Sequence, residues 1–202
     1  MKGWGNKIGS WLFSFLTLLG LSASPAATFD IADGDVTALV NAITTSNTNG
    51  QNDTINLADG GTYILTSVNN SADGPNGLPI IQTDGGHTLV INGRDSVIAR
   101  NTVMGTANFR VLNNGSGKVT LVRLLIGNGQ VLGATVPSGT SGGGIFNRGT
   151  LTLKDCTVSS NSAVTTMSGS KSAGGGLFNF QGTLNLDRSS ILSNSSTGPN
   201  ST

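Results

Sequence analysis

The chain contains no glutamate, one cysteine, one histidine and one tyrosine among 202 residues. A single cysteine excludes an intramolecular disulfide, and a single histidine excludes a metal site built from several histidines. A net charge of +1 and a small aromatic content argue against a nucleic-acid partner. All ten acidic residues are aspartates, and Gly, Ser, Thr and Asn are abundant. This composition favours short strands and turns over helices.

The first 27 residues have the layout of a secretory signal peptide. Lys2 and Lys7 precede an apolar run at residues 11–21, and small residues follow up to Ala27. The run is too short to span a hydrocarbon layer about 30 Å thick, so a membrane-spanning anchor is excluded. We expect residues 1–27 to be removed during export, which leaves a secreted or cell-surface protein without a membrane span.

One segment of the chain occurs twice. Residues 142–163 read GGGIFNRGTLTLKDCTVSSNSA, and residues 174–196 read GGGLFNFQGTLNLDRSSILSNSS. The two copies begin 32 residues apart (174 − 142). A repeat of this length indicates one supersecondary unit that buries its apolar face only against a neighbouring unit. The repeat therefore predicts a solenoid.

Weaker copies precede these two and align with them in columns. Stacked parallel strands would place the members of a column about 4.8 Å apart. The predicted apolar columns are Ile81, Leu112, Phe146 and Phe178; Leu89, Val119, Leu151 and Leu184; and Ile91, Leu121, Leu153 and Leu186. The polar column Gln82, Asn113, Asn147 and Asn179 predicts a ladder of side-chain amides, and Asn161 with Asn194 predicts a second ladder.

The front of the mature chain has a different pattern. Asp35 precedes an apolar stripe with helical spacing, which predicts a helix at residues 36–45 with Asp35 as its N-cap. Strands are expected at residues 54–57 and 62–65. Residues 28–66 would then form an N-terminal cap over coils that occupy residues 67–202. The Ser/Thr/Gly-rich segments 130–141 and 164–173 are expected to be loops.

These segments resemble the coils of bacterial right-handed parallel β-helix proteins. The GGGIFN…GTLTLKDCTVSSNSA copy is similar to repeats of polymorphic outer membrane proteins and autotransporter passenger domains. Residues 53–66 and 77–81 look like the start of the same group. The resemblance covers residues 29–196 and implies an all-β, right-handed single-stranded parallel β-helix, a pectate-lyase-like solenoid with a short capping helix. Because the group includes adhesins, surface proteins and polysaccharide-degrading enzymes, it implies a fold and not one activity.

Polysaccharide lyases and glycoside hydrolases with this fold place carboxylates, and lyases also a basic residue, on one strand face. The candidates for such a role are Asp155, Asp187 and Arg188. The alignment pairs Asp155 with Arg188, and Lys154 with Asp187, as in cross-strand salt bridges. No two carboxylates share a column, although glycoside hydrolysis requires a carboxylate pair. The salt-bridge interpretation is therefore preferred.

Asp30, Asp33 and Asp35 form an aspartate-rich segment that resembles a Ca²⁺ loop. The segment lacks a later bidentate acid, so a turn followed by the Asp35 N-cap is the preferred interpretation. His87 is expected in an exposed turn, and Cys156 is expected to be a small buried core residue. The sequence predicts no cofactor.

We expect an exported, non-catalytic structural or adhesive module with glycans or host or cell-surface molecules as partners. The alternative is a fragment of a polysaccharide lyase or glycoside hydrolase. The last repeat also lacks the polar, atypical pattern that closes most solenoids. We therefore expect a longer parent chain and self-association through the uncapped last coil.

Overall fold

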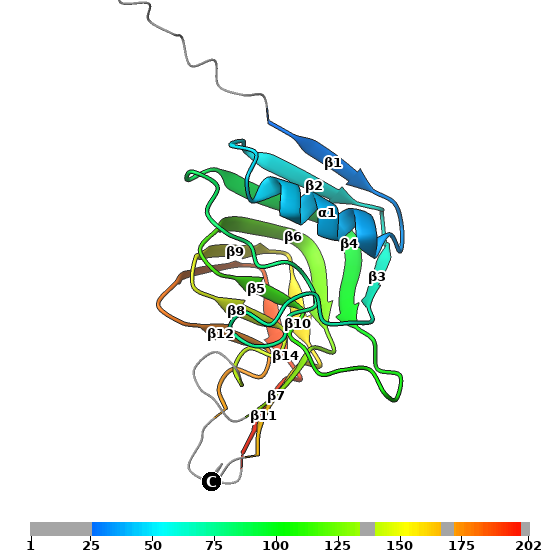
Figure 1. Cartoon of the computed structure of the whole chain (residues 1–202), viewed down its shortest axis with the longest axis vertical. Helices are drawn as coiled ribbons and strands as arrows, with labels where there is room; N and C mark the ends of the chain where they lie inside the picture. The colour runs from blue at the N-terminus through cyan, green and yellow to red at the C-terminus, as the bar shows by residue number, and fades with distance from the viewer. Residues whose placement is uncertain (1–25, 134–139, 167–171, 199–202) are drawn as a thin grey trace, which may run out of the picture.

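The computed structural model describes residues 26–133, 140–166 and 172–198 (Figure 1). These residues form a parallel β-solenoid of about four turns with one short helix. The expected all-β class, a parallel β-helix, is confirmed. The expected signal peptide lies outside the described residues except for its last two positions. The boundary expected between a cap at 28–66 and coils at 67–202 stays a prediction.

Fifteen strands and one helix follow one another along the described chain. In chain order they are β1 (Thr28–Ile31), α1 (Val36–Ser46), β2 (Asp53–Leu57), β3 (Thr62–Leu65), β4 (Thr88–Arg100), β5 (Leu112–Asn114), β6 (Lys118–Gly127), β7 (Gln130–Gly133), β8 (Ile145–Asn147), β9 (Thr150–Lys154), β10 (Thr157–Ser159), β11 (Ser162–Thr165), β12 (Leu177–Asn179), β13 (Thr183–Asp187), β14 (Ser190–Leu192) and β15 (Ser195–Thr197). All pairings between these strands are parallel.

The strands form three sheets that run along the stack. The largest has the order β1-β2-β4-β6-β10-β14, with β3 beside β4 and with β9 and β13 continuing from β6. The other two have the orders β15-β11-β7 and β12-β8-β5. Each of the last two described coils, β8–β11 and β12–β15, contributes four short strands (Figure 1). β4 and β6 continue through the corner that separates β9 from β10 in the later coils. β6 therefore pairs with both β9 and β10, and the two faces belong to one large sheet.

Two of the three predicted apolar columns have the expected register. Leu89 pairs with Val119, which pairs with Leu151, and Leu151 pairs with Leu184. The column from Ile91 to Leu186 is in register in the same way. Because side chains alternate along a strand, Leu151 and Leu153 both point inward, where they are fully buried. These columns are the centre of the hydrophobic core.

The remaining apolar column and the polar column differ from the prediction at β5. Leu112 pairs with Ile145, Asn113 with Phe146, and Asn114 with Asn147. The predicted pairing of Asn113 with Asn147 is therefore wrong by one residue. The predicted columns required a turn two residues longer after β5 than after β8, whereas the turn is one residue longer, because three residues separate β5 from β6 and two separate β8 from β9. The residues predicted one coil earlier are displaced as well, because Ile81 forms its bridge with Asn114.

Parts of the two segments expected to be loops form strands. Residues 130–133 are β7, and β11 extends to residue 165. Val131 and Ala163 point inward and are fully buried. A short alternation of inward apolar and outward polar side chains is therefore enough to pack these strands against the core. The central parts of both segments lie outside the described residues.

The helix α1 covers the first coil. It ends at Ser46, one residue beyond the prediction, and the Asp35 side chain accepts a hydrogen bond from the Ala38 amide at 2.8 Å as its N-cap. Leu39 and Ile43 are fully buried, and α1 contacts β1, β2 and β3 (Figure 1). Within the described ranges, no helix is long and apolar enough to cross a membrane.

Candidate functional site

Four charged residues occupy equivalent corners of successive coils. They are Asp95, Arg123, Asp155 and Arg188, which we call the charged corner. Their φ angles are 64°, 48°, 52° and 47°, in the left-handed region that is uncommon for residues other than glycine. This conformation turns the chain from one strand into the next, as between β9 and β10. The four side chains therefore follow the stacking direction of the coils.

The charged corner consists of two fork-shaped ion pairs. Arg188 donates from Nε to Asp155 Oδ1 at 2.7 Å and from Nη2 to Oδ2 at 2.9 Å. Arg123 donates from Nε to Asp95 Oδ1 at 2.9 Å, and its Nη2 contacts Oδ2. Paired hydrogen bonds of this kind are the strongest and most directional that a carboxylate makes. Each pair links one coil to the next.

The pairing keeps both carboxylates ionised. Hydrogen bonding from Arg123 lowers the pKa of Asp95 below its ordinary value, and hydrogen bonding from Arg188 does the same to the pKa of Asp155. A general acid at neutral pH needs a carboxyl group with a raised pKa. A shallow hollow of about 170 Å³ beside these residues is lined by Asp95, Arg123 and Asp155. Its acidic groups are hydrogen-bond acceptors that are already engaged.

The structure brings the three sequence candidates together, but as ion-pair partners. Asp187 lies in register with Lys154, as the alignment expected. Its ion pair is instead with Arg188, from Nη1 to Oδ1 at 2.8 Å. Sequence reasoning missed Asp95 and Arg123, the other half of the charged corner. The coils that contain them match the repeat weakly. The one sequence signal for these two residues is their position at the turn between two strand segments of a coil, directly before the second segment.

Each aspartate of the segment considered as a Ca²⁺ loop has a separate contact. Asp30 Oδ1 accepts from Asn56 Nδ2 at 2.9 Å, and Asp33 Oδ1 accepts from the Thr62 amide at 2.7 Å. Asp35 caps α1. Among the described residues, no three His, Cys, Asp or Glu side chains form a group suited to a metal ion. The arrangement favours the turn and cap interpretation of this segment.

Side-chain amides stack through the coils as two ladders. Asn114 Nδ2 donates to Asn147 Oδ1 at 2.8 Å, and Asn147 Nδ2 donates to Asn179 Oδ1 at 2.6 Å. Asn161 Nδ2 donates to Asn194 Oδ1 at 3.0 Å in the second ladder. Bonds of this kind connect each coil to the next at a fixed register.

Aromatic rings stack beside the first ladder. Phe146 and Phe178 lie in register with ring centroids 5.8 Å apart. Phe180, which the predicted column does not include, lies 6.3 Å from Phe146. Asn113 occupies the Phe146 position in the preceding coil, where its Nδ2 reaches the Ala72 carbonyl at 3.5 Å. The aromatic stack therefore begins at Phe146.

Arg110 is a fully buried arginine that sequence reasoning missed. Its guanidinium donates to the carbonyl oxygens of Gly142 at 2.9 Å and Ser141 at 2.7 Å, and to Asn76 Oδ1 at 2.7 Å. It also lies 4.8 Å from the centroid of the Phe146 ring. Burial lowers the pKa of Arg110 to about 10, so the side chain keeps its charge at neutral pH. Arg110 joins three segments that lie far apart in the sequence.

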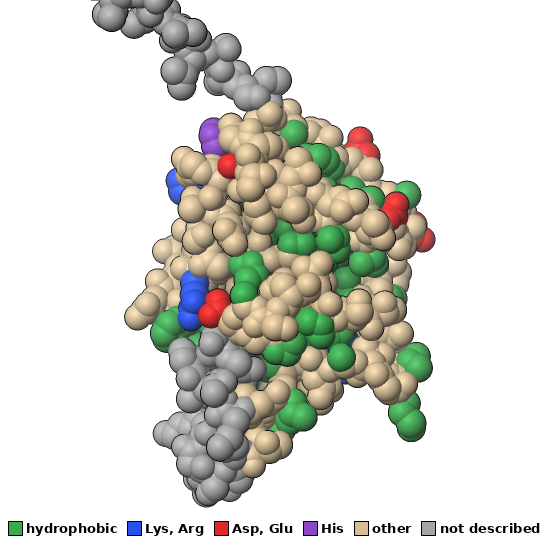
Figure 2. All heavy atoms as spheres, viewed as in Figure 1, with side chains coloured by type: hydrophobic (Ala, Val, Ile, Leu, Met, Phe, Trp, Pro, Cys, Tyr) green, Lys and Arg blue, Asp and Glu red, His purple; other side chains and the backbone are tan. Residues whose placement is uncertain are grey.

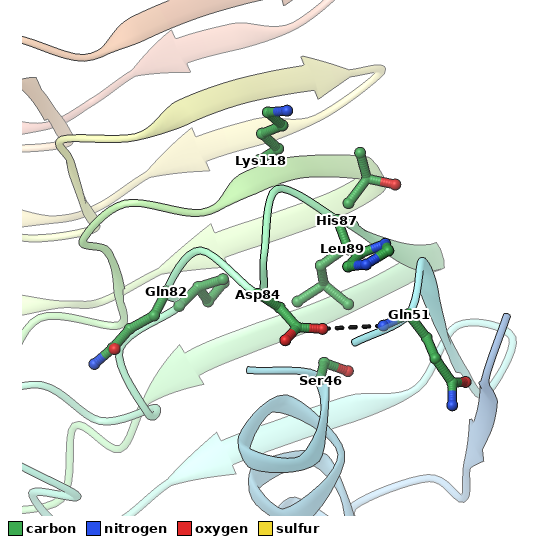
Figure 3. A pocket seen from close by; sticks show the side chains of 9 residues that line it. Ser46, Gln51, Gln82, Asp84, His87, Leu89 and Lys118 are labelled. Carbon is green, nitrogen blue, oxygen red and sulfur yellow. Dashed lines mark hydrogen bonds between the residues drawn. The ribbon is translucent and has the colours of Figure 1, made fainter. Parts of the chain in front are cut away.

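The single cysteine and the single histidine do not form a catalytic arrangement. Cys156 is buried, and burial raises the pKa of its thiol, which disfavours the reactive thiolate. His87 lines a small pocket with Ser46 and Asp84 (Figure 3). Asp84 Oδ2 instead accepts from the backbone amide of Gln51 at 3.1 Å, and no hydrogen bond joins the three side chains in the described chain.

Comparisons with protein-family models, with curated proteins and with solved structures returned no match for this chain.

Acid should weaken the fold through the charged corner. The folded pKa values of Asp95 and Asp155 lie below the ordinary value of 3.8. The stabilisation from the ion pairs is therefore fully present above that value and is lost as the pH falls through the lower folded values. We expect the melting temperature of Asp155→Asn to fall less steeply than that of the wild type between about pH 5 and pH 2. Equal slopes in thermal unfolding would show that the pair contributes nothing.

Proposed function

We propose that this chain is an exported, non-catalytic solenoid module with a structural or adhesive role at a cell surface. The observation that carries the proposal is the charged corner. Where a polysaccharide lyase or hydrolase would need free carboxylates, Asp155 and Asp95 are each held by an arginine of the next coil. The amide ladders and the Phe146–Phe178 stack connect the coils in the same way. A rigid scaffold of this kind suits the presentation of a surface.

A column of mostly polar side chains on one sheet face supports glycans as the partner class. Outward-pointing side chains of β2, β4, β6, β9 and β13 form a register column that contains Thr54, Val90, Thr120, Thr152 and Asn185. Adjacent members of the column lie about 4.8 Å apart. The hydroxyl and amide groups of this column, which only Val90 interrupts, are suited to hydrogen bonding with a hydroxyl-rich polymer. Glycan binding should therefore be lost in Thr120→Arg and retained in Ser159→Arg, whose side chain belongs to β10.

The absence of turnover is the central test. We expect the full chain to produce no unsaturated or reducing ends from polygalacturonate or related glycans in absorbance and reducing-sugar assays. The variants Asp155→Ala and Asp187→Ala should leave that result unchanged. Turnover by the wild type that either substitution abolishes would replace this proposal with the lyase or hydrolase alternative.

Export is tested with the same full-length chain. Expression of the whole chain in a bacterium should yield a product outside the cytoplasm whose first residue is Ala27 or Thr28, by N-terminal sequencing. A product that retains Met1 and stays in the cytoplasm would contradict export.

Self-association is proposed for the last described coil. Leu186 and Ile191 are 50% and 42% exposed, whereas their stacking equivalents Leu153 and Val158 are fully buried. Leu192, in register with Ser159, is 48% exposed. We expect oligomers of the full chain in light scattering, and we expect Leu186→Lys to shift them toward monomer. Ile64→Lys at the α1 end, where the side chain is 39% exposed, is the matched control and should leave the oligomers unchanged. A monomeric wild type would contradict this contact.

A further inference from the structure

The loop between α1 and β2 contains an asparagine followed by a glycine, a sequence that can rearrange without an enzyme. The amide nitrogen of such a glycine can attack the side-chain carbonyl carbon of the asparagine, because glycine carries no side chain to hinder the approach. The chain has five Asn-Gly steps, which begin at Asn49, Asn76, Asn92, Asn114 and Asn128. Their reactivity depends on the room around each glycine and on the groups that face the reacting atoms.

The first of these steps is the one with free space around its glycine. Gly50 is exposed, and a Cβ there would meet no atom within 4 Å. A Cβ at any of the other four glycines would lie 2.8 Å or less from a neighbouring atom. Asn76 and Asn114 are also fully buried. Ring closure at these four steps would have to displace packed neighbours, so the fold protects them.

The groups around Asn49 are placed as its rearrangement requires. The Gln51 amide donates to Asn49 Oδ1 at 3.1 Å, where it would stabilise the negative charge that develops on this oxygen during attack. The attacking group, the Gly50 amide, donates to Asp84 Oδ2 at 2.7 Å. Figure 3 shows Asp84 directed at this loop, where it also accepts from the Gln51 amide. Its carboxylate can accept the Gly50 amide proton as the new bond forms.

We propose that Asn49 is a site of self-catalysed deamidation. The Gly50 nitrogen forms a bond to Asn49 Cγ, and the Cγ–Nδ2 bond breaks. The side-chain amide group leaves as ammonia, together with the proton that the Gly50 amide gives up, and a succinimide ring remains. Water then supplies a hydroxyl group to one ring carbonyl carbon and a proton to the ring nitrogen. Opening at Cγ gives aspartate, and opening at the main-chain carbonyl carbon gives isoaspartate.

Either product would loosen the attachment of the cap to the first coil. Asn49 Nδ2 donates to Asp53 Oδ1 at 2.9 Å, and Asp53, the first residue of β2, is 2% exposed. Deamidation removes this donor, and aspartate puts a second carboxylate beside the buried one. Like charges at this distance repel, and burial makes the repulsion stronger. We expect the loop to separate from the start of β2.

The test follows the full chain during incubation at mildly alkaline pH, with peptide mapping by mass spectrometry. We expect deamidation at Asn49 to be at least about tenfold faster than at each of the other four Asn-Gly steps. Each event adds one negative charge to a chain whose net charge is +1 and whose face in Figure 2 carries few charged side chains, so ion-exchange chromatography separates the products.

The unfolded chain is the control for the effect of the fold. In guanidinium chloride the five steps should react at similar rates, and Asn49 should react no faster than in the folded chain. Equal rates at the five steps of the folded chain would overturn the proposal, and so would a faster reaction of Asn49 after unfolding.

A conservative variant tests the proton acceptor. Asp84→Asn keeps an oxygen that can accept from the Gly50 amide, but it lacks the charge that takes up the proton. It should slow the reaction at Asn49 by about tenfold or more. An unchanged rate would exclude Asp84 from the reaction.

The effect on the cap is measured with a variant that carries the aspartate product from the start. Asn49→Asp should lower the melting temperature by about 4–8 °C. The matched control is Asn69→Asp, because Asn69 is exposed and its Oδ1 already accepts from Asn70 Nδ2. This control adds the same charge and keeps the acceptor, so its melting temperature should stay close to that of the wild type. An Asn49→Asp variant as stable as the wild type would show that deamidation leaves the cap attached.

Discussion

Replacement of Gly143 with alanine is expected to lower the free energy of unfolding by about 3–5 kcal/mol. A Cβ at this position would overlap the carbonyl oxygen of Ser162 and lie 2.6 Å from that of Gly175. Both obstacles are backbone atoms, so neither can rotate away as a side chain could. The adjacent coils would have to separate, which weakens the 2.9 Å hydrogen bond from the Gly144 amide to the Gly176 carbonyl. Urea or thermal unfolding followed by circular dichroism measures the loss.

The matched control is Gly105→Ala. Gly105 has a φ of +92°, and a Cβ there would meet no atom within 4 Å. This variant therefore isolates backbone strain, expected at about 1–2 kcal/mol, from the overlap at Gly143, where φ is not positive. If Gly143→Ala destabilises the chain no more than Gly105→Ala, the close stacking of the triple-glycine segments is wrong.

The repeat was sufficient to predict the stacking of the main core columns. In a parallel solenoid, two copies that recur after 32–33 residues, together with the two-residue alternation of a strand, leave few alternatives to stacking Leu151 on Leu184 and Leu153 on Leu186. The helix after Asp35 was predictable for a local reason, because its cap and its apolar stripe are both contained in a dozen residues. Both predictions depended on patterns that are local or closely repeated along the chain.

The register at β5 was not predictable in the same way. Asn113 and Asn114 are consecutive asparagines, and either could continue the ladder to Asn147. An apolar residue was expected opposite Phe146, which favoured the alignment of Leu112 there. The extra turn residue after β5 decides for Asn114. Such an insertion leaves no trace in the hydrophobic pattern, because the strands on either side keep their alternation.

The network around Arg110 shows a second limit. Arginine is almost never fully buried without partners, so no local pattern predicts it in the core. Its partners Asn76, Ser141 and Gly142 lie 34, 31 and 32 residues away in the sequence. Only the stacking of the coils brings these segments together. The pairing of Asp95 with Arg123 was missed for the same reason.

Replacement of Arg110 with methionine is expected to cost about 3–5 kcal/mol of unfolding free energy. Methionine keeps much of the length and the apolar contact with Phe146, but it supplies no donor. The carbonyl oxygens of Ser141 and Gly142 and the side chain of Asn76 would then lose their buried partner. Chemical denaturation should show a lower midpoint, and limited proteolysis should show faster cleavage near Asn76, because that segment loses its link to the core.

Arg123→Met is the control for the loss of an arginine as such. Arg123 makes a fork-shaped ion pair with Asp95, but the pair is exposed and screened by water and salt, so its removal should have a much smaller effect. Arg110→Lys keeps the positive charge but not the planar set of donors, and it should fall between the wild type and Arg110→Met. If Arg110→Met is no more destabilising than Arg123→Met, the buried guanidinium does not hold the three segments together. An Arg110→Lys variant as stable as the wild type would instead assign the role to charge alone.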